Sequence, residues 1–504
     1  MIEADLVEFR QIQVYIFNSF SFSQNFSSSF KVYFSKRLSQ LFKSPLGFMG
    51  PHLTRTNGSL IQTGNSGITF SPGKFEFFVT GKVRILLWIR LLLQLIALQI
   101  ALVLPFRKKF SQKTKFNLFF SLSPSQIAHN GSITDLLTFL QEPRFEMNSK
   151  FDFYLVEGKS PKYGTAEEKC LVVTRNIPIY LARNFFSYRE RFKLILLNFS
   201  KLITISRSVK SSPINLLGSG ALFEESIYQL FFKIFPNVTL FTTPSQFTFQ
   251  PIAFELQAES KQSRRIMMHY SANTIPFRYS NPSVGKPDES IYACASIDEQ
   301  WVWTEEHGSY LSRLNQKPSI VKGSMMFYSP ITKNPKLHAG GKKILLFDVT
   351  PQDLEEAGGT MYSLENMRGF ITDIVDVVQE LGAKQDSNFE ILLKPKRKYS
   401  KIHSIPYYSF LQEYKSADLI HLLDPELDIY SIIQDSDVVI CIPFTSPAII
   451  ANEMGIPSCY YTSMEEVTLP EISNGSQVIR STQVLSQFLV NSLGLTQNLA
   501  LDEY

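Results

Sequence analysis

The segment that most constrains the fold lies near the C-terminus, at residues 438–461. It contains an apolar run, a short polar turn with Thr445 and Ser446, a helix-like stretch, and a second apolar run entered through Gly455 and Pro457. Short apolar runs bounded by turn residues are typical of strands buried in a parallel sheet. The segment therefore predicts a strand–helix–strand unit of an α/β fold.

The turn of this unit is a candidate anion site. Thr445 and Ser446 fall where the turn becomes the helix, so their hydroxyls and the free backbone N–H groups there would favour a phosphate. Glu453 follows two helical turns later on the same face, where it would accept hydrogen bonds from sugar hydroxyls. The plainer interpretation is that Thr445 and Ser446 only cap the helix and that Glu453 is an exposed carboxylate.

Composition narrows the class of protein. A chain of 504 residues is long for one domain, and 44% hydrophobic with 19% charged residues indicates a sizeable buried core. The net charge of +5 fits an anionic small molecule or a membrane surface and is too weak to indicate nucleic acid. The four cysteines are widely separated and have no zinc or disulfide spacing, which favours a reducing cytoplasm.

The pattern along the chain predicts two domains. Residues 115–330 and 342–504 each alternate short apolar strands with helices, and residues 331–341 resemble a linker. We therefore expect two Rossmann-like α/β domains, with ligands at the carboxyl ends of their strands. The expected strands are 151–156, 170–174, 238–241, 265–270, 344–350, 389–393 and 419–423. The expected helices are 133–140, 188–197, 223–235, 367–381 and 407–414.

The N-terminal part has a different character. Residues 1–80 are rich in Ser, Phe, Gln and Asn, which indicates a low-complexity extension without a secretory signal. Residues 82–109 contain the most apolar run of the chain, flanked by basic residues and interrupted by Arg90 and Gln94. Three interpretations stay open for this apolar helix: a membrane span, a helix on an anionic bilayer surface, or a buried core helix.

Three strand ends of the second domain carry polar groups. Asp348 and Thr350 follow the first strand, Lys394, Lys396 and Arg397 follow the second, and the hydroxyl turn follows a later one. If the sheet is parallel, these groups meet in one crevice. A basic cluster facing hydroxyls would bind a phosphate and stabilise it as a leaving group. The alternative is that the lysine-rich run is a solvated loop.

The first domain offers candidates for an acceptor site. Gly218 and Gly220 predict a small-residue loop leading into a helix that contains Glu224, which would serve as a general base. His269 ends an apolar strand and is a second candidate base, although a lone His on such a strand is more often a packed core residue. The neighbouring polar residues, which would shape the acceptor site, are Tyr270, Ser271 and Asn273.

Metal and cofactor signals are absent from the sequence. No cluster has metal-ligand spacing, and no Asp-x-Asp triplet follows a strand. We therefore expect no metal and no cofactor, with the basic cluster and a helix dipole neutralising the leaving phosphate.

At these residues the chain resembles a bacterial polysaccharide-biosynthesis family named for a Pro-Phe-Thr-Ser motif, found among O-antigen and surface-polysaccharide proteins. Here the motif occupies residues 443–446, and residues 347–351, 393–396 and 269–273 are similar to the family's pattern in the same order. The resemblance covers roughly residues 150–490. One departure is Lys396, because related enzymes often have His after Lys-Pro, which leaves open which residue contacts the donor phosphate.

The resemblance implies a two-domain, GT-B-type glycosyltransferase. Its C-terminal domain would bind a nucleotide-sugar donor and its N-terminal domain a glycan acceptor, which we expect to be lipid-linked. The implied location is the cytoplasmic face of the inner membrane, with the protein peripheral or anchored by a single helix. Two other hypotheses remain: a nucleotide-sugar epimerase of the same architecture, and a non-catalytic subunit of a polysaccharide assembly complex.

Overall fold

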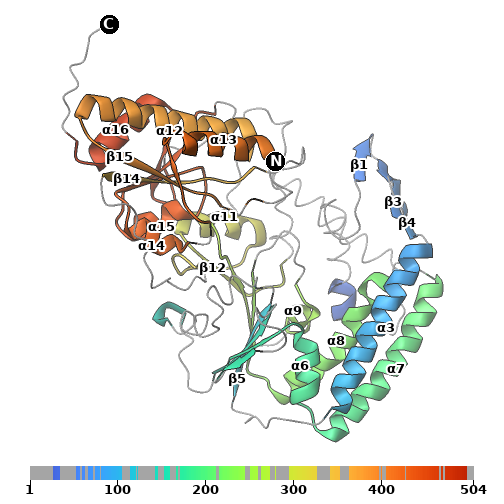
Figure 1. The fold of residues 1–504 in the computed structure, drawn as a ribbon. Coiled ribbons are helices and arrows are strands. Elements are labelled where there is room, and N and C mark those ends of the chain that lie inside the picture. Colours follow the sequence, from blue (N-terminus) through green and yellow to red (C-terminus); the bar gives the residue numbers. More distant parts are fainter. Residues whose placement is uncertain are drawn as a thin grey trace. The chain divides into compact units, whose positions relative to one another are not determined.

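The chain divides into two units in the computed structural model (Figure 1). Unit 1 comprises residues 1–268, 288–301 and 311–320, and unit 2 comprises residues 269–287, 302–310 and 321–504. The residues that the structure describes are 27–33, 53–56, 59–62, 66–71, 74–79, 81–104, 114–120, 122, 142–145, 152–158, 166–168, 171–211, 215–243, 250–258, 263–272, 278–279, 295–325, 341–351, 362–396, 399, 404–425, 427–464, 467–468 and 472–495. Most of the predicted extension and of the predicted linker therefore lies outside the described residues.

Unit 1 is built on an eight-stranded sheet with the order β13-β12-β10-β9-β5-β6-β8-β7. Strands β12, β10, β9, β5, β6 and β8 are mutually parallel, and β7 is antiparallel. Numbered along the chain, these six parallel strands have the spatial order 3-2-1-4-5-6 of a Rossmann fold. Their bounds are β5 (Lys115–Phe120), β6 (Asp152–Glu157), β7 (Ala166–Glu168), β8 (Leu171–Thr174), β9 (Val238–Thr242), β10 (Arg264–Met268), β12 (Glu299–Val302) and β13 (Ser319–Val321).

Phenylalanine rings fill much of the core of unit 1. The ring of Phe116, on β5, is fully buried and meets four others edge-on, with centroid distances from 4.8 to 5.6 Å. Edge-to-face pairs are the favourable geometry for aromatic rings, so these contacts add to the hydrophobic stabilisation. The four partner rings are Phe153, Phe185, Phe231 and Phe235.

Four helices of unit 1 pack against one another beside the sheet (Figure 1). The predicted apolar segment forms α3, and one face of this helix, with Leu91, Leu95 and Leu98, is buried in the core. Among the described helices, none is long and apolar enough to span a bilayer. The helices of unit 1 are α3 (Gly81–Val103), α6 (Ile177–Asn184), α7 (Tyr188–Ser211), α8 (Asn215–Ile234) and α9 (Ile252–Leu256), and η1 (Pro143–Phe145) is a single 3₁₀ turn.

Unit 2 repeats the same plan with a seven-stranded sheet, in the order β16-β15-β14-β17-β18-β21-β20. All neighbouring strands are parallel except β20, and the six parallel strands again have the order 3-2-1-4-5-6. Their bounds are β14 (Lys342–Phe347), β15 (Phe389–Lys394), β16 (His421–Leu422), β17 (Val438–Cys441), β18 (Ser458–Tyr461), β20 (Ile472–Ser473) and β21 (Ser476–Ile479).

Helices cover both faces of this second sheet. Helices α12, α13 and α16 lie on one side, and α14 and α15 lie on the other (Figure 1). Their bounds are α12 (Leu364–Gln385), α13 (Ile405–Ser416), α14 (Ile429–Gln434), α15 (Pro447–Glu453) and α16 (Thr482–Ser492). The remaining elements are the hairpins β1 (Leu53–Thr56) with β2 (Ser59–Gln62) and β3 (Ser66–Ser71) with β4 (Lys74–Val79), the antiparallel pair β11 (Arg278–Tyr279) and β19 (Val467–Thr468), and helix α11 (Glu305–Asn315).

The prediction of two parallel-sheet α/β units is confirmed, and the predicted strands all appear with shifts of a few residues. Strand β5 was not among the predicted strands, although it is central in its sheet. Helix 133–140 lies outside the described residues. The division also differs from the predicted boundary, because residues 269–287, 302–310 and 321–330 belong to unit 2 rather than to the N-terminal domain.

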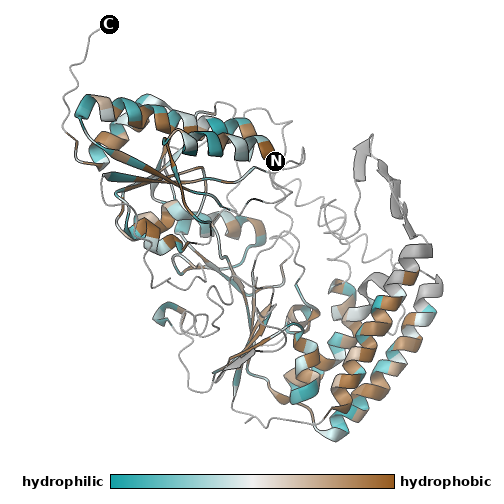
Figure 2. Ribbon diagram, viewed as in Figure 1, coloured by the Kyte–Doolittle hydropathy of each residue, from teal (hydrophilic) through white to brown (hydrophobic). Residues whose placement is uncertain are grey.

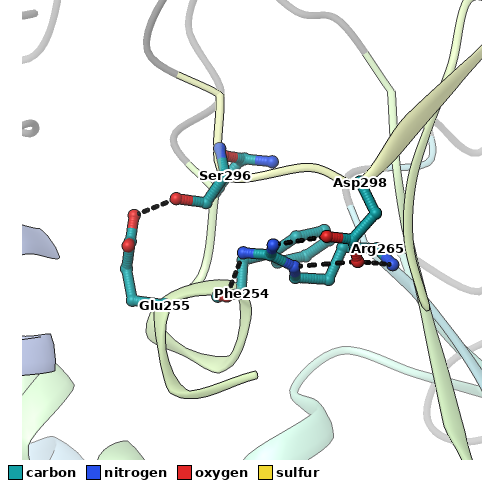
Figure 3. A network of polar contacts seen from close by, with 6 residues as sticks. Phe254, Glu255, Arg265, Ser296 and Asp298 are labelled. Atoms are coloured by element: carbon teal, nitrogen blue, oxygen red, sulfur yellow. Dashed lines mark hydrogen bonds and ion pairs between the residues drawn. The ribbon is translucent and has the colours of Figure 1, made fainter. Parts of the chain in front are cut away.

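A polar network ties three elements of unit 1 together. The buried guanidinium of Arg265 contacts both carboxylate oxygens of Asp298, at 2.5 and 3.1 Å, and donates to the carbonyl of Phe254 at 3.2 Å (Figure 3). The hydroxyl of Ser296 donates to Glu255 at 2.6 Å in the same view. A bidentate contact of this kind fixes the geometry of β10 against the segment before β12.

We expect the substitution Asp298→Ala to destabilise the protein by about 2 kcal/mol, because it leaves the buried Arg265 without its carboxylate. The neighbouring pair of Arg264 and Glu299 is a matched control, since Arg264 is half exposed and exposed pairs contribute under about 1 kcal/mol. Urea unfolding of Asp298→Ala and Arg264→Ala measures both effects. If both variants lose the same free energy of unfolding, the buried pair of Arg265 and Asp298 does not contribute more than the exposed one.

Candidate functional site

Three neighbouring strands of unit 2 bring the predicted donor residues to one edge of the sheet. Strand β14 lies between β15 and β17, and both pairings are parallel. The carboxyl ends of the three strands therefore adjoin, with Asp348, Lys394 and the turn at 442–446 at the same edge. Between β14 and β17 the strand order reverses, and this is the position where open α/β sheets bind their ligands.

Asp348 organises this edge. Its carboxylate is buried and accepts hydrogen bonds from the backbone N–H of Lys396 and from the hydroxyl of Tyr407, each at 2.7 Å. Burial raises the pKa of Asp348 to about 6, although both hydrogen bonds and the nearby lysines oppose the shift. Asp348 thus acts as a positioning group that holds the loop after β15.

Lys394, the last residue of β15, and Lys396, in the loop that follows, differ in exposure. The side chain of Lys394 is buried, and its ammonium donates to the carbonyl of Pro425 at 2.7 Å. Lys396 is exposed, and its charge lowers the pKa of Asp348. The solvated-loop interpretation therefore does not hold for Lys394. Arg397 lies outside the described residues.

Two side-chain hydroxyls hold the Pro-Phe-Thr-Ser turn by donating to backbone carbonyls. The buried hydroxyl of Thr445 donates to the carbonyl of Ile442 at 2.9 Å, and the hydroxyl of Tyr460 donates to the carbonyl of Thr445 at 3.1 Å. Thr350, at the end of the segment after β14, has a buried hydroxyl oxygen with no hydrogen-bond partner among the described residues. The edge thus combines a rigid turn with one polar atom that has no protein partner in the described structure.

Ser446 takes a different partner from the one expected of a helix cap. It occupies the N-cap position of α15 without a side-chain bond to the helix. Its hydroxyl instead accepts the backbone N–H of Ala272 at 3.1 Å and lies 3.2 Å from the hydroxyl of Ser271. Ser446 therefore anchors the segment that follows β10.

The predicted acceptor residues after β10 consequently belong to unit 2. Tyr270 and Ser271 lie in the segment that this unit includes, and Asn273 is outside the described residues. His269 is fully buried, with its ring centroid 5.0 Å from that of His307. Burial lowers the pKa of His307 to about 3. The arrangement favours the packed-core interpretation of His269 over a role as acceptor base.

Glu453 also has a protein partner. Its two carboxylate oxygens lie 3.0 and 3.3 Å from the backbone nitrogen of Ser324, which donates to them. The hydroxyl of Tyr430 donates to that of Ser324 at 3.2 Å. Glu453 is exposed, as the plainer interpretation expected, and its carboxylate also fixes the chain after β13. The sugar contact stays a prediction.

The prediction of a small-residue loop at Gly218 and Gly220 is wrong. Helix α8 begins at Asn215, so Gly218 and Gly220 lie inside the helix that carries Glu224. A Cβ atom at Gly220 would lie 2.3 Å from the side-chain oxygen of Gln94. The amide of Gln94 donates to Glu224 at 2.9 Å. The glycine therefore allows α3 to approach α8, and Gln94 is the polar contact between them.

Glu157 is a candidate general acid or base that is not among the residues predicted from the sequence. It ends β6, accepts a hydrogen bond from the backbone of Ile177 and is influenced by the charge of Glu224. Burial, followed by the charge of Glu224, raises the pKa of Glu157 to about 7. A carboxyl with such a pKa exchanges protons near neutral pH, as a general acid or base must. The signal in the sequence was a Glu directly after a buried strand.

Comparisons with known proteins gave a family match and similarities to solved structures. Residues 198–489 match the model of a family described as polysaccharide biosynthesis PFTS motif protein. No curated protein sequence matches the chain. Among solved structures, the trehalose-6-phosphate synthase OtsA is similar over 76% of this chain and 92% of its own, with 10% identity and a TM-score of 0.41.

Two further solved structures show comparable similarity. A glycosyltransferase from Rickettsia africae is 11% identical, over 76% of this chain and 89% of its own, with a TM-score of 0.36. The wall teichoic acid polymerase TagF is 9% identical, over 82% of this chain and 89% of its own, with a TM-score of 0.37.

Proposed function

The chain belongs to the polysaccharide biosynthesis family of PFTS motif proteins, and from this premise we propose that it is a GT-B-type glycosyltransferase. The observation that carries the proposal is the edge of unit 2 where β14, β15 and β17 end side by side. Rossmann-type sheets bind nucleotide ligands at this position. The reaction transfers a sugar from a nucleotide-activated donor to a glycan of a surface polysaccharide such as O-antigen.

The donor diphosphate binds along the carboxyl end of the unit 2 sheet. Lys394 and Lys396 supply cationic donors, and Asp348 holds the loop that presents them. The hydroxyl of Thr350 is available to a ligand, because it has no partner among the described residues. The lysines neutralise the leaving nucleoside diphosphate, so we propose transfer that needs no metal or cofactor.

The acceptor base lies in unit 1. Glu224, which the sequence indicated, and Glu157, which the structure adds, form an electrostatically coupled carboxylate pair. Because each carboxylate opposes ionisation of the other, the pair retains a proton until near-neutral pH. Deprotonated Glu157 then removes a proton from the acceptor hydroxyl as that oxygen attacks the sugar.

The proposed acceptor is a glycan carried by a lipid. Its location is the cytoplasmic face of the inner membrane, where the nucleotide-activated donor and a membrane-anchored glycan meet. The support for this proposal is the membership of a polysaccharide-biosynthesis family and the basic, apolar segment at 82–109.

A thermal-shift screen of the purified protein tests the donor proposal. Nucleotide sugars carrying UDP, GDP, CMP, CDP and dTDP are added separately. A ligand at a hundredfold excess over its dissociation constant stabilises the folded state by about 2.7 kcal/mol, so one nucleotide class should raise the melting temperature clearly. The free nucleoside diphosphate should reproduce part of the shift, because the lysines bind its phosphates.

Two outcomes would contradict the proposal. No shift with any nucleotide sugar, in a sample that melts cooperatively, would favour a non-catalytic subunit. Conversion of a nucleotide sugar to its epimer without an added acceptor would favour the epimerase hypothesis.

A further inference from the structure

Helices α3 and α7 expose an apolar face. Of eighteen large apolar side chains that are exposed in the described part of the chain, thirteen lie on these two helices. Soluble monomers rarely expose contiguous apolar surface on this scale unless it is an interaction site. Figure 2 shows the two helices side by side, both rich in hydrophobic residues.

The exposed positions form one continuous stripe on each helix. On α3 they recur every three or four residues from Ile85 through Leu93 to Val103, and on α7 from Phe192 to Ile203. This spacing places them on a single side of each helix, except for Leu197, which lies on another side of α7. The opposite side of α3 is buried in the core of unit 1. The exposed stripe is therefore a surface of the folded unit.

The two stripes are held in one surface by direct contact. The buried guanidinium of Arg191, on α7, donates to the carbonyl of Leu102 near the end of α3, at 3.3 Å. It also donates to the carbonyls of Phe186 and Arg183, which fixes the start of α7. The helices are in contact and run antiparallel (Figure 1), so the two stripes extend along neighbouring helices.

The charged residues on these helices are almost all basic. Helices α3 and α7 contain nine Lys or Arg residues and one acidic residue, Glu190. Arg189, Lys193 and Arg207 are exposed on α7, at positions that flank its apolar stripe. Apolar side chains bordered by basic ones match the acyl chains and anionic headgroups of a bilayer surface.

We propose that the joint face of α3 and α7 binds the surface of an anionic membrane, with both helices lying in the plane of the bilayer. The apolar stripes enter the boundary between headgroups and acyl chains, and the flanking basic residues contact anionic headgroups. This inference rests on the proposed membrane location. It adds α7 as a second membrane-binding helix, a role that the sequence did not indicate. It does not require the transferase chemistry.

Vesicle flotation of the full-length protein, without any nucleotide sugar, tests this inference. We expect the protein to float with vesicles containing roughly one-third phosphatidylglycerol in phosphatidylcholine, and binding should weaken at high salt. The double substitution Leu93→Asp and Phe192→Asp should lower the partition coefficient at least about tenfold. Ile405→Asp is the matched control, because Ile405 in unit 2 is 61% exposed, as is Leu93, and it should bind like the wild type.

A second variant keeps the test independent of folding. Arg189→Glu combined with Lys193→Glu changes only exposed charges and should also weaken binding to the anionic vesicles. The inference is overturned if the wild type does not float, or if both double variants float as it does. It is also overturned if the wild type is a lipid-free dimer that Leu93→Asp with Phe192→Asp dissociates, because a second copy then covers the face. If a nucleotide sugar raises the melting temperature but the protein does not bind vesicles, only this inference is contradicted and the proposed function stands.

Discussion

Replacing Glu157 by glutamine is expected to lower kcat/KM for sugar transfer about a hundredfold or more. The side chain keeps its shape but loses the ability to accept the proton of the acceptor hydroxyl. A loss of this size is typical of removing a general base. The substitution should not weaken the fold, because it removes a charge that burial disfavours.

The pH dependence gives this prediction a specific signature. In the folded protein the pKa of Glu157 is about 7, against an ordinary value of 4.5. A base must be deprotonated, so kcat/KM of the wild type should rise as the pH increases through about 7. The variant should lack this rise. Glu224→Gln removes the neighbouring charge, so it should move the rise to lower pH.

Stability should change in the opposite direction. Between pH 4.5 and about 7 the folded state binds the Glu157 proton more tightly than the unfolded state does, so this group's contribution to stability falls as the pH rises. The loss is complete above the folded pKa and amounts to up to about 3 kcal/mol. At about pH 8, Glu157→Gln should therefore be at least as stable as the wild type.

Transfer assays and urea unfolding at several pH values measure both effects. Glu413→Gln, at an exposed position of α13, is the matched control and should change neither. If a folded Glu157→Gln variant keeps the kcat/KM of the wild type, Glu157 is not the general base. A variant that loses stability and activity together would indicate a structural role.

Replacing both Lys394 and Lys396 by methionine is expected to weaken donor binding about a hundredfold. Hydrogen bonds to charged groups contribute about 1.5–3 kcal/mol each, and a total near 3 kcal/mol corresponds to that factor. Methionine keeps an unbranched apolar side chain, so the packing of the buried Lys394 changes little. The pKa of Asp348 should rise further, because both lysines lower it in the wild type.

Calorimetric titration with the nucleotide sugar found in the thermal-shift screen measures this loss. Lys384→Met is the control, since Lys384 lies exposed on α12 and pairs only with the exposed Glu380 in the described structure. Unchanged donor affinity in a folded double variant would place the diphosphate elsewhere. A loss of affinity that grows with falling salt would support a direct charge contact.

Most of the buried strands could be predicted from the sequence. Apolar runs such as 438–442 and 389–393 identified buried strands, because a strand covered on both faces has no polar side to interrupt it. Strand β5 was harder to recognise, since its five residues after Lys115 include Asn117 and three phenylalanines, a pattern that fits other structures as well.

The side-chain partners seen in the structure were not predicted. The hydroxyl of Ser446 accepts the backbone N–H of Ala272 and the carboxylate of Glu453 accepts that of Ser324, while the donor-binding roles of both residues stay predictions. These partners are more than a hundred residues away in the chain. No local pattern encodes such contacts, because they depend on which loops the sheet brings together.

Local patterns in the chain were enough to predict the α/β class, two domains of alternating strands and helices, the family motif and the polar residues at three strand ends of unit 2. These follow from local periodicity and turn chemistry, which act over a few residues. The order of the strands, the influence of Glu224 on Glu157, and the apolar stripes on the neighbouring helices α3 and α7 became apparent only in the folded structure. Those features arise from packing between distant segments, where burial and neighbouring charges set the chemistry of each side chain.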